Sequence, residues 1–327
     1  MSSFERKQLQ LRLFPEGIPK LWCPTITHFS AAAKPDAARI EDHLRRIAPF
    51  VKGILVPGST GEGWQMSDRD IRNLLDIVLP LSQQLGIRVL IGVLKTDVDQ
   101  MLEALDALRL HGEHPAVAGF TVCPPRGEEL SQAEIRQGLR RILERGQPTA
   151  LYQLPQVTGN EMAPETVATL AAEFPNFFLF KDTSGADRVA LANVDLSGVF
   201  LVRGSEQTGY AQWPRSAGGP YDGFLLSTAN AFAPALNQML QLLNAGKKEE
   251  AIKLSADLEQ LVTGAFEIVK NVEHGNAFAN ANKLLEHVRT FGTFSLQQPA
   301  PMLYNGVRLP VELVQRVQEL LDGSALR

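Results

Sequence analysis

Short apolar runs alternate with amphipathic segments along most of this chain. The short runs are rich in aliphatic and aromatic side chains without helical spacing, which is typical of strands buried on both faces. They predict strands at residues 21–27, 53–57, 89–94, 119–123, 149–154, 177–181, 199–204 and 222–227.

The segments between these runs carry apolar residues every three or four positions and predict helices. Asp36 precedes the first, in which Ile40 and Leu44 share a face, and Ser131 with Glu134 forms a capping box before another. Eight strand–helix units at roughly 30-residue spacing predict an α/β protein with a closed (β/α)8 TIM barrel. A doubly wound sheet is disfavoured, because it would have fewer units and no G-x-G-x-x-G follows the first strand.

After Asn230 the strand pattern stops and only helical segments follow. We therefore expect residues 21–233 to form the barrel and residues 234–327 to form a C-terminal helical extension. Residues 1–20 are expected to be an N-terminal arm or short helix, interrupted by two prolines. The predicted helices of the extension lie around residues 236–243, 248–269, 277–290 and 310–321.

The sixth predicted strand ends on Lys181. A lysine at the mouth of an apolar strand is held where water is scarce, which disfavours its charged form and lowers its pKa. A neutral amine is a nucleophile that can form a Schiff base with a ketone. Alternatively, Lys181 forms an ion pair with a nearby carboxylate, for which Asp182 is the adjacent candidate.

Three further strand ends carry candidate chemistry. The second strand is followed by Gly58-Ser59-Thr60-Gly61-Glu62-Gly63, whose backbone N–H groups could converge on a carboxylate or phosphate, although a plain tight turn fits equally well. Tyr152 lies near the end of the fifth strand and could transfer protons, unless it is simply a buried aromatic. Gly204 ends the seventh strand. Because active sites of such barrels lie at the carboxyl ends of the strands, we expect these groups to meet Lys181 there.

Composition narrows the class of protein. The net charge is −4 with no block of like charge, so neither a nucleic-acid surface nor a polybasic membrane patch is expected. The polar N-terminus and the lack of a long apolar run predict neither a secretory signal nor a membrane span. The two cysteines, Cys23 and Cys123, form no CxxC motif. We therefore expect them to be reduced and the protein to be cytoplasmic. His111-x-x-His114 lacks a third ligand, so no metal site is expected.

Four motifs together resemble the dihydrodipicolinate synthase / N-acetylneuraminate lyase superfamily. They occur in the family's order and spacing, and the resemblance extends from about Leu21 to Phe294. The motifs are Gly58-Ser59-Thr60-Gly61-Glu62, Tyr152-x-x-Pro155-x-x-x-Gly159, Lys181-Asp182-Thr183-Ser184-Gly185 and Gly223-x-x-x-Ser227-x-x-Asn230-x-x-x-Pro234.

The resemblance implies a cofactor-free class I aldolase mechanism. Lys181 would form a Schiff base with a 2-oxo acid such as pyruvate, and Tyr152 would be the proton-transfer phenol. Ser59 and Thr60 would bind the substrate carboxylate, with Ser59 also in the proton relay. Gly204 is a further candidate for substrate binding, because the end of the seventh strand brings it to the same site. The family further implies a homotetramer or homodimer.

Two departures bear on the reaction. Dihydrodipicolinate synthases carry an arginine two residues after the proline of the tyrosine motif, where this chain has Val157. They also carry a tyrosine pair in the loop after the fourth strand, whereas residues 123–129 contain none. Arg126 in that loop could hold an acidic substrate tail or could simply be solvated, and Arg203 and Glu206 are weaker candidates for lining the pocket.

The sequence therefore predicts a Schiff-base lyase, either an aldolase or a dehydratase, that acts on a 2-oxo acid. The reaction either releases pyruvate or uses a 2-keto-3-deoxy sugar acid. The alternative within the family is 4-hydroxy-tetrahydrodipicolinate synthase. The alternative of another class is a non-catalytic sensor of 2-oxo acids.

Overall fold

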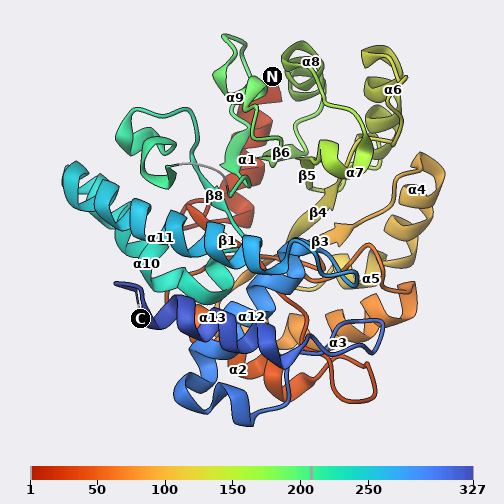
Figure 1. The fold of residues 1–327 in the computed structure, drawn as a ribbon. Helices are drawn as coiled ribbons and strands as arrows, with labels where there is room; N and C mark the ends of the chain where they lie inside the picture. The colour runs from red at the N-terminus through yellow and green to blue at the C-terminus, as the bar shows by residue number, and fades with distance from the viewer. Residues whose placement is uncertain (1, 207–208, 327) are drawn as a thin grey trace.

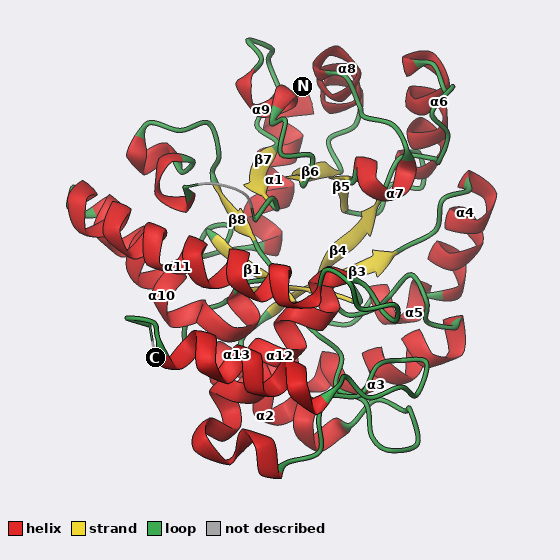
Figure 2. Ribbon diagram, viewed as in Figure 1, coloured by secondary structure: helices red, strands yellow, loops and turns green. Residues whose placement is uncertain are grey.

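Eight parallel strands close into one barrel in the computed structural model, which describes residues 2–206 and 209–326. The strands pair in the order in which they occur along the chain, and Figure 2 shows them at the centre of the molecule with helices around them. Each overlaps its predicted segment, so the predicted (β/α)8 barrel is confirmed. The strands are β1 Leu21–Pro24, β2 Gly53–Val56, β3 Arg88–Val93, β4 Val117–Val122, β5 Thr149–Gln153, β6 Phe177–Asp182, β7 Phe200–Arg203 and β8 Gly223–Leu225.

The helices follow the predicted alternation except around β7. Asp36 caps α2 by accepting from the Arg39 N–H at 3.2 Å, and both halves of the Ser131–Glu134 capping box form at α6. Between β6 and β7 the helix is the single turn α9, and between β7 and β8 the described residues form only the 3-10 turns η1 and η2. Glycines and prolines interrupt the chain there, which explains the loss of the expected helix. The helical elements are α1 Ser2–Leu13, α2 Ala37–Ile47, α3 Asp68–Leu85, α4 Val98–Ala107, α5 Arg109–Gly112, α6 Gln132–Leu143, α7 Pro155–Thr158, α8 Pro164–Glu173, α9 Arg188–Leu191, η1 Tyr210–Gln212, η2 Arg215–Ala217, α10 Ala229–Asn244, α11 Lys248–Val269, α12 Ala277–Phe291, η3 Gly292–Gln297 and α13 Val311–Asp322.

The N-terminal helix α1 packs against α8 and β6 (Figure 1). Its Arg6 is buried and donates to the carbonyl oxygens of Phe174 and Phe177 at 2.8 and 2.6 Å. After the helix, the Phe14 ring lies 5.8 Å from the Trp22 ring and joins the apolar cluster inside the barrel. The N-terminal segment therefore closes the barrel at the amino ends of the strands.

The last four α-helices, α10 to α13, pack together at one side of the barrel (Figure 1, cyan to blue). The predicted start of the extension at residue 234 falls inside α10, directly after a kink at Phe232, where φ is −124° and ψ is 29°. The division of the chain at this point stays a prediction. In the described part of the chain, no helix has the length and apolar character to cross a bilayer.

Candidate active site

Lys181 lies near the carboxyl end of β6, directly opposite Tyr152 of β5 in the parallel register. The lysine is 4% exposed, and its Nζ lies 3.9 Å from the centroid of the Tyr152 ring. Burial lowers the pKa of Lys181 to about 7, an effect that Cys123 and Glu206 partly oppose. Lys181 makes no ion pair with any described residue, so a neutral amine is available at this position.

Tyr152 is also buried, at 2% exposure, and this burial raises the pKa of its phenol. The side chains of Ser59 and Thr183 interact with the phenol and partly offset the rise. The Ser59 hydroxyl accepts a hydrogen bond from Trp64 Nε1 at 2.8 Å, which leaves its own proton free to point elsewhere. The predicted proton-transfer pair of Tyr152 and Ser59 is thus brought together.

Residues 58–63, which we call the anion loop, present two unused backbone donors. The N–H groups of residues 61–63 donate to carbonyls within the loop at 3.0–3.1 Å. In contrast, the N–H groups of Ser59 and Thr60 donate to no residue that the structure describes. Adjacent free N–H groups of this kind form a concave site for a carboxylate.

A buried ion pair fixes the anion loop from outside the barrel. Glu62, which has a φ of +62°, accepts from Lys283 of α12 and from the backbone N–H of Tyr304 at 2.9 Å. Asn276, which caps α12, also donates to the Ser59 carbonyl at 3.0 Å. The sequence analysis missed this support, because more than two hundred residues separate Glu62 from Lys283 and no local pattern connects them.

Gly204 lies directly against Lys181. A Cβ at position 204 would lie 2.7 Å from Lys181 Cε and 2.5 Å from Thr183 Oγ1, so only glycine leaves the lysine its place. The structure thereby places all five predicted residues at the same end of the barrel.

Two cavities lie beside this cluster, with Ser59 in the lining of one and Thr183 in the lining of the other, whereas Lys181 and Tyr152 line neither. One has a volume of about 660 Å³ and the other about 510 Å³, and Gln156 lines both. Arg126 lines the first, and its Nε donates to the Val157 carbonyl at 2.9 Å. Ser59 and Asn276 also line the first cavity, whereas Thr183, Ser205 and Glu206 line the second.

The expectation that Arg203 lines the pocket is wrong. Arg203 is 1% exposed and forms a double hydrogen bond with Asp187, with both distances 3.0 Å, while its guanidinium lies 3.9 Å from the Trp213 ring. Its charge is therefore used to hold the segment after β6. Glu206 does line a cavity, and it accepts from Ser227 and Thr228 of the β8 end.

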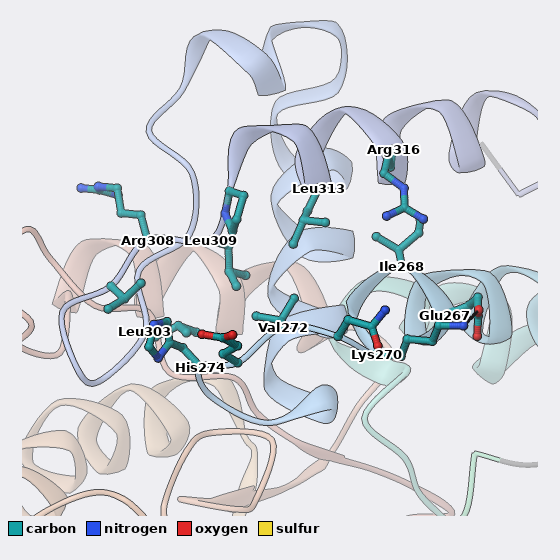
Figure 3. A pocket seen from close by; sticks show the side chains of 14 residues that line it. Glu267, Ile268, Lys270, Val272, His274, Leu303, Arg308, Leu309, Leu313 and Arg316 are labelled. Atoms are coloured by element: carbon teal, nitrogen blue, oxygen red, sulfur yellow. Dashed lines mark hydrogen bonds and ion pairs between the residues drawn. The ribbon is translucent and has the colours of Figure 1, made fainter.

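A further pocket of about 600 Å³ lies within the C-terminal helices (Figure 3). Its lining comes from the end of α11, the loop that follows, the segment before α13 and α13 itself, including Lys270, His274, Leu309 and Arg316. None of the predicted site residues lines it, so we assign the chemistry to the barrel mouth.

Comparison with known proteins shows to which family the chain belongs. The sequence model of the dihydrodipicolinate synthetase family matches residues 22–278. The chain belongs to this family. A 4-hydroxy-tetrahydrodipicolinate synthase of Sulfurihydrogenibium sp. is 28% identical over 223 residues, which cover 64% of this chain and 72% of that protein.

Solved structures of the family share the fold. A variant of Sulfolobus solfataricus 2-keto-3-deoxygluconate aldolase matches with a TM-score of 0.72 and 17% identity, covering 93% of this chain and 96% of that one. A family member from an E. coli prophage, solved in complex with pyruvate, matches with a TM-score of 0.73 and 19% identity, covering 92% and 97% of the two chains. As a member of the dihydrodipicolinate synthetase family, this chain is a Schiff-base-dependent lyase.

Proposed function

We propose that this lyase cleaves a 2-keto-3-deoxy sugar acid, as an aldolase or a dehydratase, with Lys181 as the nucleophile. The observation that carries the proposal is the buried Lys181 amine, with a pKa of about 7, beside the Tyr152 phenol. At neutral pH a large fraction of this amine is uncharged and therefore able to attack a ketone.

The proposed reaction begins when Lys181 Nζ attacks the C2 carbonyl of the substrate, whose carboxylate lies against the free N–H groups of Ser59 and Thr60. Tyr152, with Ser59 behind it, delivers the proton with which the carbinolamine loses water to form a protonated imine. In the aldolase, the Tyr152 phenolate left by that transfer takes the proton of the C4 hydroxyl as the C3–C4 bond breaks; the electron pair of this bond forms an enamine and an aldehyde leaves. Protonation of the enamine at C3 and hydrolysis of the imine release pyruvate and regenerate the amine.

In the dehydratase, the Tyr152 phenolate removes a C3 proton to give the same type of enamine and returns that proton to the C4 hydroxyl, which leaves as water. Hydrolysis of the resulting unsaturated imine releases the product and regenerates the amine. Both reactions use the imine as an electron sink. The structure supports either reaction equally.

The preference for a sugar acid rests on the lining of the cavity. Val157 packs against the buried group of Cys123, Tyr152 and Leu154, so it supplies no charge for an aldehyde's carboxylate. The mouth instead offers amide side chains, which suit a polyhydroxy chain, while Arg126, the arginine in this lining, already donates through Nε to the Val157 carbonyl. These features disfavour 4-hydroxy-tetrahydrodipicolinate synthase activity, which stays the alternative.

Borohydride trapping tests the nucleophile. We expect pyruvate plus borohydride to leave a stable adduct on the Lys181 peptide, detected by mass spectrometry, and Lys181→Ala to lose it. Lys283 is the internal control, because it is equally buried but held by Glu62, and it should stay unmodified. Absence of an adduct with every 2-oxo acid tried would refute the Schiff-base assignment to Lys181.

A substrate screen then separates the alternatives. Turnover of 2-keto-3-deoxy acids supports the proposal, whereas condensation of pyruvate with an amino aldehyde would favour the synthase. An adduct without turnover of any substrate would favour a non-catalytic sensor of 2-oxo acids. We further propose a cytoplasmic homotetramer or homodimer, as the family resemblance implies, and light scattering of the purified protein tests that assembly.

A further inference from the structure

His28, His43 and Glu286 come together apart from Lys181. His28 follows β1, His43 lies on α2 and Glu286 lies on α12. His28 Nε2 is 3.7 Å from one carboxylate oxygen of Glu286, His43 Nδ1 is 3.9 Å from the other, and all three ligand atoms lie within 4.8 Å of one another. Neither ring nitrogen has a hydrogen-bond partner in the described part of the chain.

Asn230 fixes the proton on the His43 ring. Its Nδ2 donates to the carbonyl oxygens of Pro24 and Ser227 at 3.0 and 2.8 Å, so its Oδ1 must be the acceptor, as its bond from the Ile26 N–H also requires. That oxygen lies 3.0 Å from His43 Nε2, which must therefore carry the proton.

In the neutral ring, His43 Nδ1 is consequently a bare lone pair directed toward a carboxylate. His43 is 1% exposed, so water has almost no access to this lone pair. A lone pair facing an anion in a dry interior is unfavourable unless a cation lies between them. A ring nitrogen held by a hydrogen bond on its far side is also the usual state of a metal-binding histidine.

We propose that His28 Nε2, His43 Nδ1 and the Glu286 carboxylate bind a divalent transition metal such as Zn²⁺. Ligand atoms of a four-coordinate zinc are separated by roughly 3.4 Å, so the observed gaps require each group to move inward by less than about 1 Å. A cavity of about 240 Å³, lined by His28 and Glu286 together with the cationic side chains of Arg39, Lys283 and Arg308, gives an ion and a fourth, water ligand access to the site.

Two arginines already contact Glu286 and must compete with the metal. Arg39 lies 3.3 Å from one carboxylate oxygen and Arg46 contacts the other. Their side chains are 25% and 40% exposed, so both can turn toward solvent when an ion binds. The metal would then connect the first strand–helix unit with α12, the helix whose Lys283 holds the anion loop, and its role would be structural.

Cobalt binding tests the site directly. The full chain, free of any histidine tag and treated with a chelator, is titrated with Co²⁺, whose visible absorption reports four-coordinate nitrogen and oxygen ligands. We expect one equivalent to bind and Zn²⁺ to displace it while raising Tm. His28→Gln and His43→Gln should lose the absorption band, whereas the control His111→Gln, a histidine paired with Asp76 at the surface, should keep it.

The arginine provides a second, opposite readout. Arg46→Gln removes a competitor for Glu286 and should tighten Co²⁺ binding, whereas it cannot do so if Glu286 is no ligand. Circular dichroism confirms that each variant is folded. Failure of the wild-type chain to bind Co²⁺, binding that His43→Gln leaves intact, or unchanged affinity in Arg46→Gln would each overturn the proposal. None of these results depends on borohydride trapping at Lys181.

Discussion

A charged ammonium at position 181 would have lost most of its water, and no described carboxylate pairs with it. The fold can hold this lysine because its pKa is low enough for the neutral form to be well populated at neutral pH. The same burial that makes the amine a nucleophile therefore costs folding free energy. This trade-off between stability and activity is expected where a reactive group is built into a packed core.

Lys181→Met should stabilise the protein, and more so at pH 6 than at pH 9. Below pH 7 the lysine is charged in both the folded and the unfolded chain, so the penalty is fully present. Between pH 7 and 10.5 only the unfolded chain keeps the proton, so the penalty shrinks as the pH rises. We expect a gain on the order of 4 kcal/mol at pH 6, declining by about 1.4 kcal/mol per pH unit above 7. Urea denaturation at both pH values measures it, and an equal gain at both would contradict the lowered pKa.

Tyr152→Phe should slow turnover much more than it weakens binding of the 2-oxo acid. The ring that packs beside Lys181 remains, but the hydroxyl to which we assign proton transfer with the carbinolamine is lost, and loss of such a group typically costs about 10²- to 10⁴-fold in rate. Turnover of the substrate and the pyruvate concentration for half-maximal trapping are measured on the same preparation. Wild-type turnover in the variant would remove Tyr152 from the mechanism.

Among the elements, α12 reaches the anion loop from outside the barrel. Its Lys283 meets Glu62, and its capping residue Asn276 contacts the Ser59 carbonyl. The C-terminal helices therefore contact the anion loop through two residues of a single helix, its N-cap Asn276 and Lys283 near its middle.

Lys283→Met should destabilise the fold and weaken binding of the 2-oxo acid. It leaves Glu62 buried without its cation, which costs about 3–5 kcal/mol. The loop amides of Ser59 and Thr60 lose their fixed position, so half-maximal trapping should need about tenfold more pyruvate, equivalent to 1.4 kcal/mol. Adding Glu62→Gln removes the stranded charge and should restore part of the stability. Unchanged trapping in a folded Lys283→Met variant would show that the pair does not position the loop.

The elements that sequence predicted well are those with a local signal. Apolar runs placed β6 and the lysine near its end, the box of Ser131 and Glu134 placed the start of α6, and the predicted bounds of α11 are those observed. The glycine loop was expected to meet the end of β5, and its Ser59 does lie beside the Tyr152 phenol.

What sequence could not predict depends on contacts between distant segments. Two buried clusters form only once the barrel has folded, and no regular sequence spacing connects their members. They are Glu62 with Lys283, and Glu286 with His28 and His43. Arg203 was misassigned for the same reason, because Asp187 and Trp213, which take up its charge, come from different loops. Each of these is a buried charged group whose partner is set by tertiary structure.

Across the whole molecule, the amino and carboxyl ends of the barrel have different tasks. The groups assigned to chemistry lie at the carboxyl ends of the strands, whereas α1 and the ring of Phe14 close the amino end. Arg6 holds that closure by donating to carbonyl oxygens at the end of α8, at the start of β6 and, through Ser197, in the segment before β7.

Arg6→Met tests this separation of tasks. The substitution keeps most of the apolar stem but leaves buried carbonyl oxygens without a donor, so we expect a loss of about 3–5 kcal/mol in the free energy of unfolding. Lys7→Met is the matched control, because Lys7 is exposed on the same helix and its replacement should change stability by no more than about 0.5 kcal/mol.

Because β6 runs from the Arg6 contact at Phe177 to Lys181, the two ends of the barrel are joined by one strand that is buried throughout. If that strand stays rigid, the folded Arg6→Met protein should keep wild-type trapping by pyruvate at Lys181. Loss of trapping in a folded variant would instead show that closure of the amino end also sets the position of the lysine.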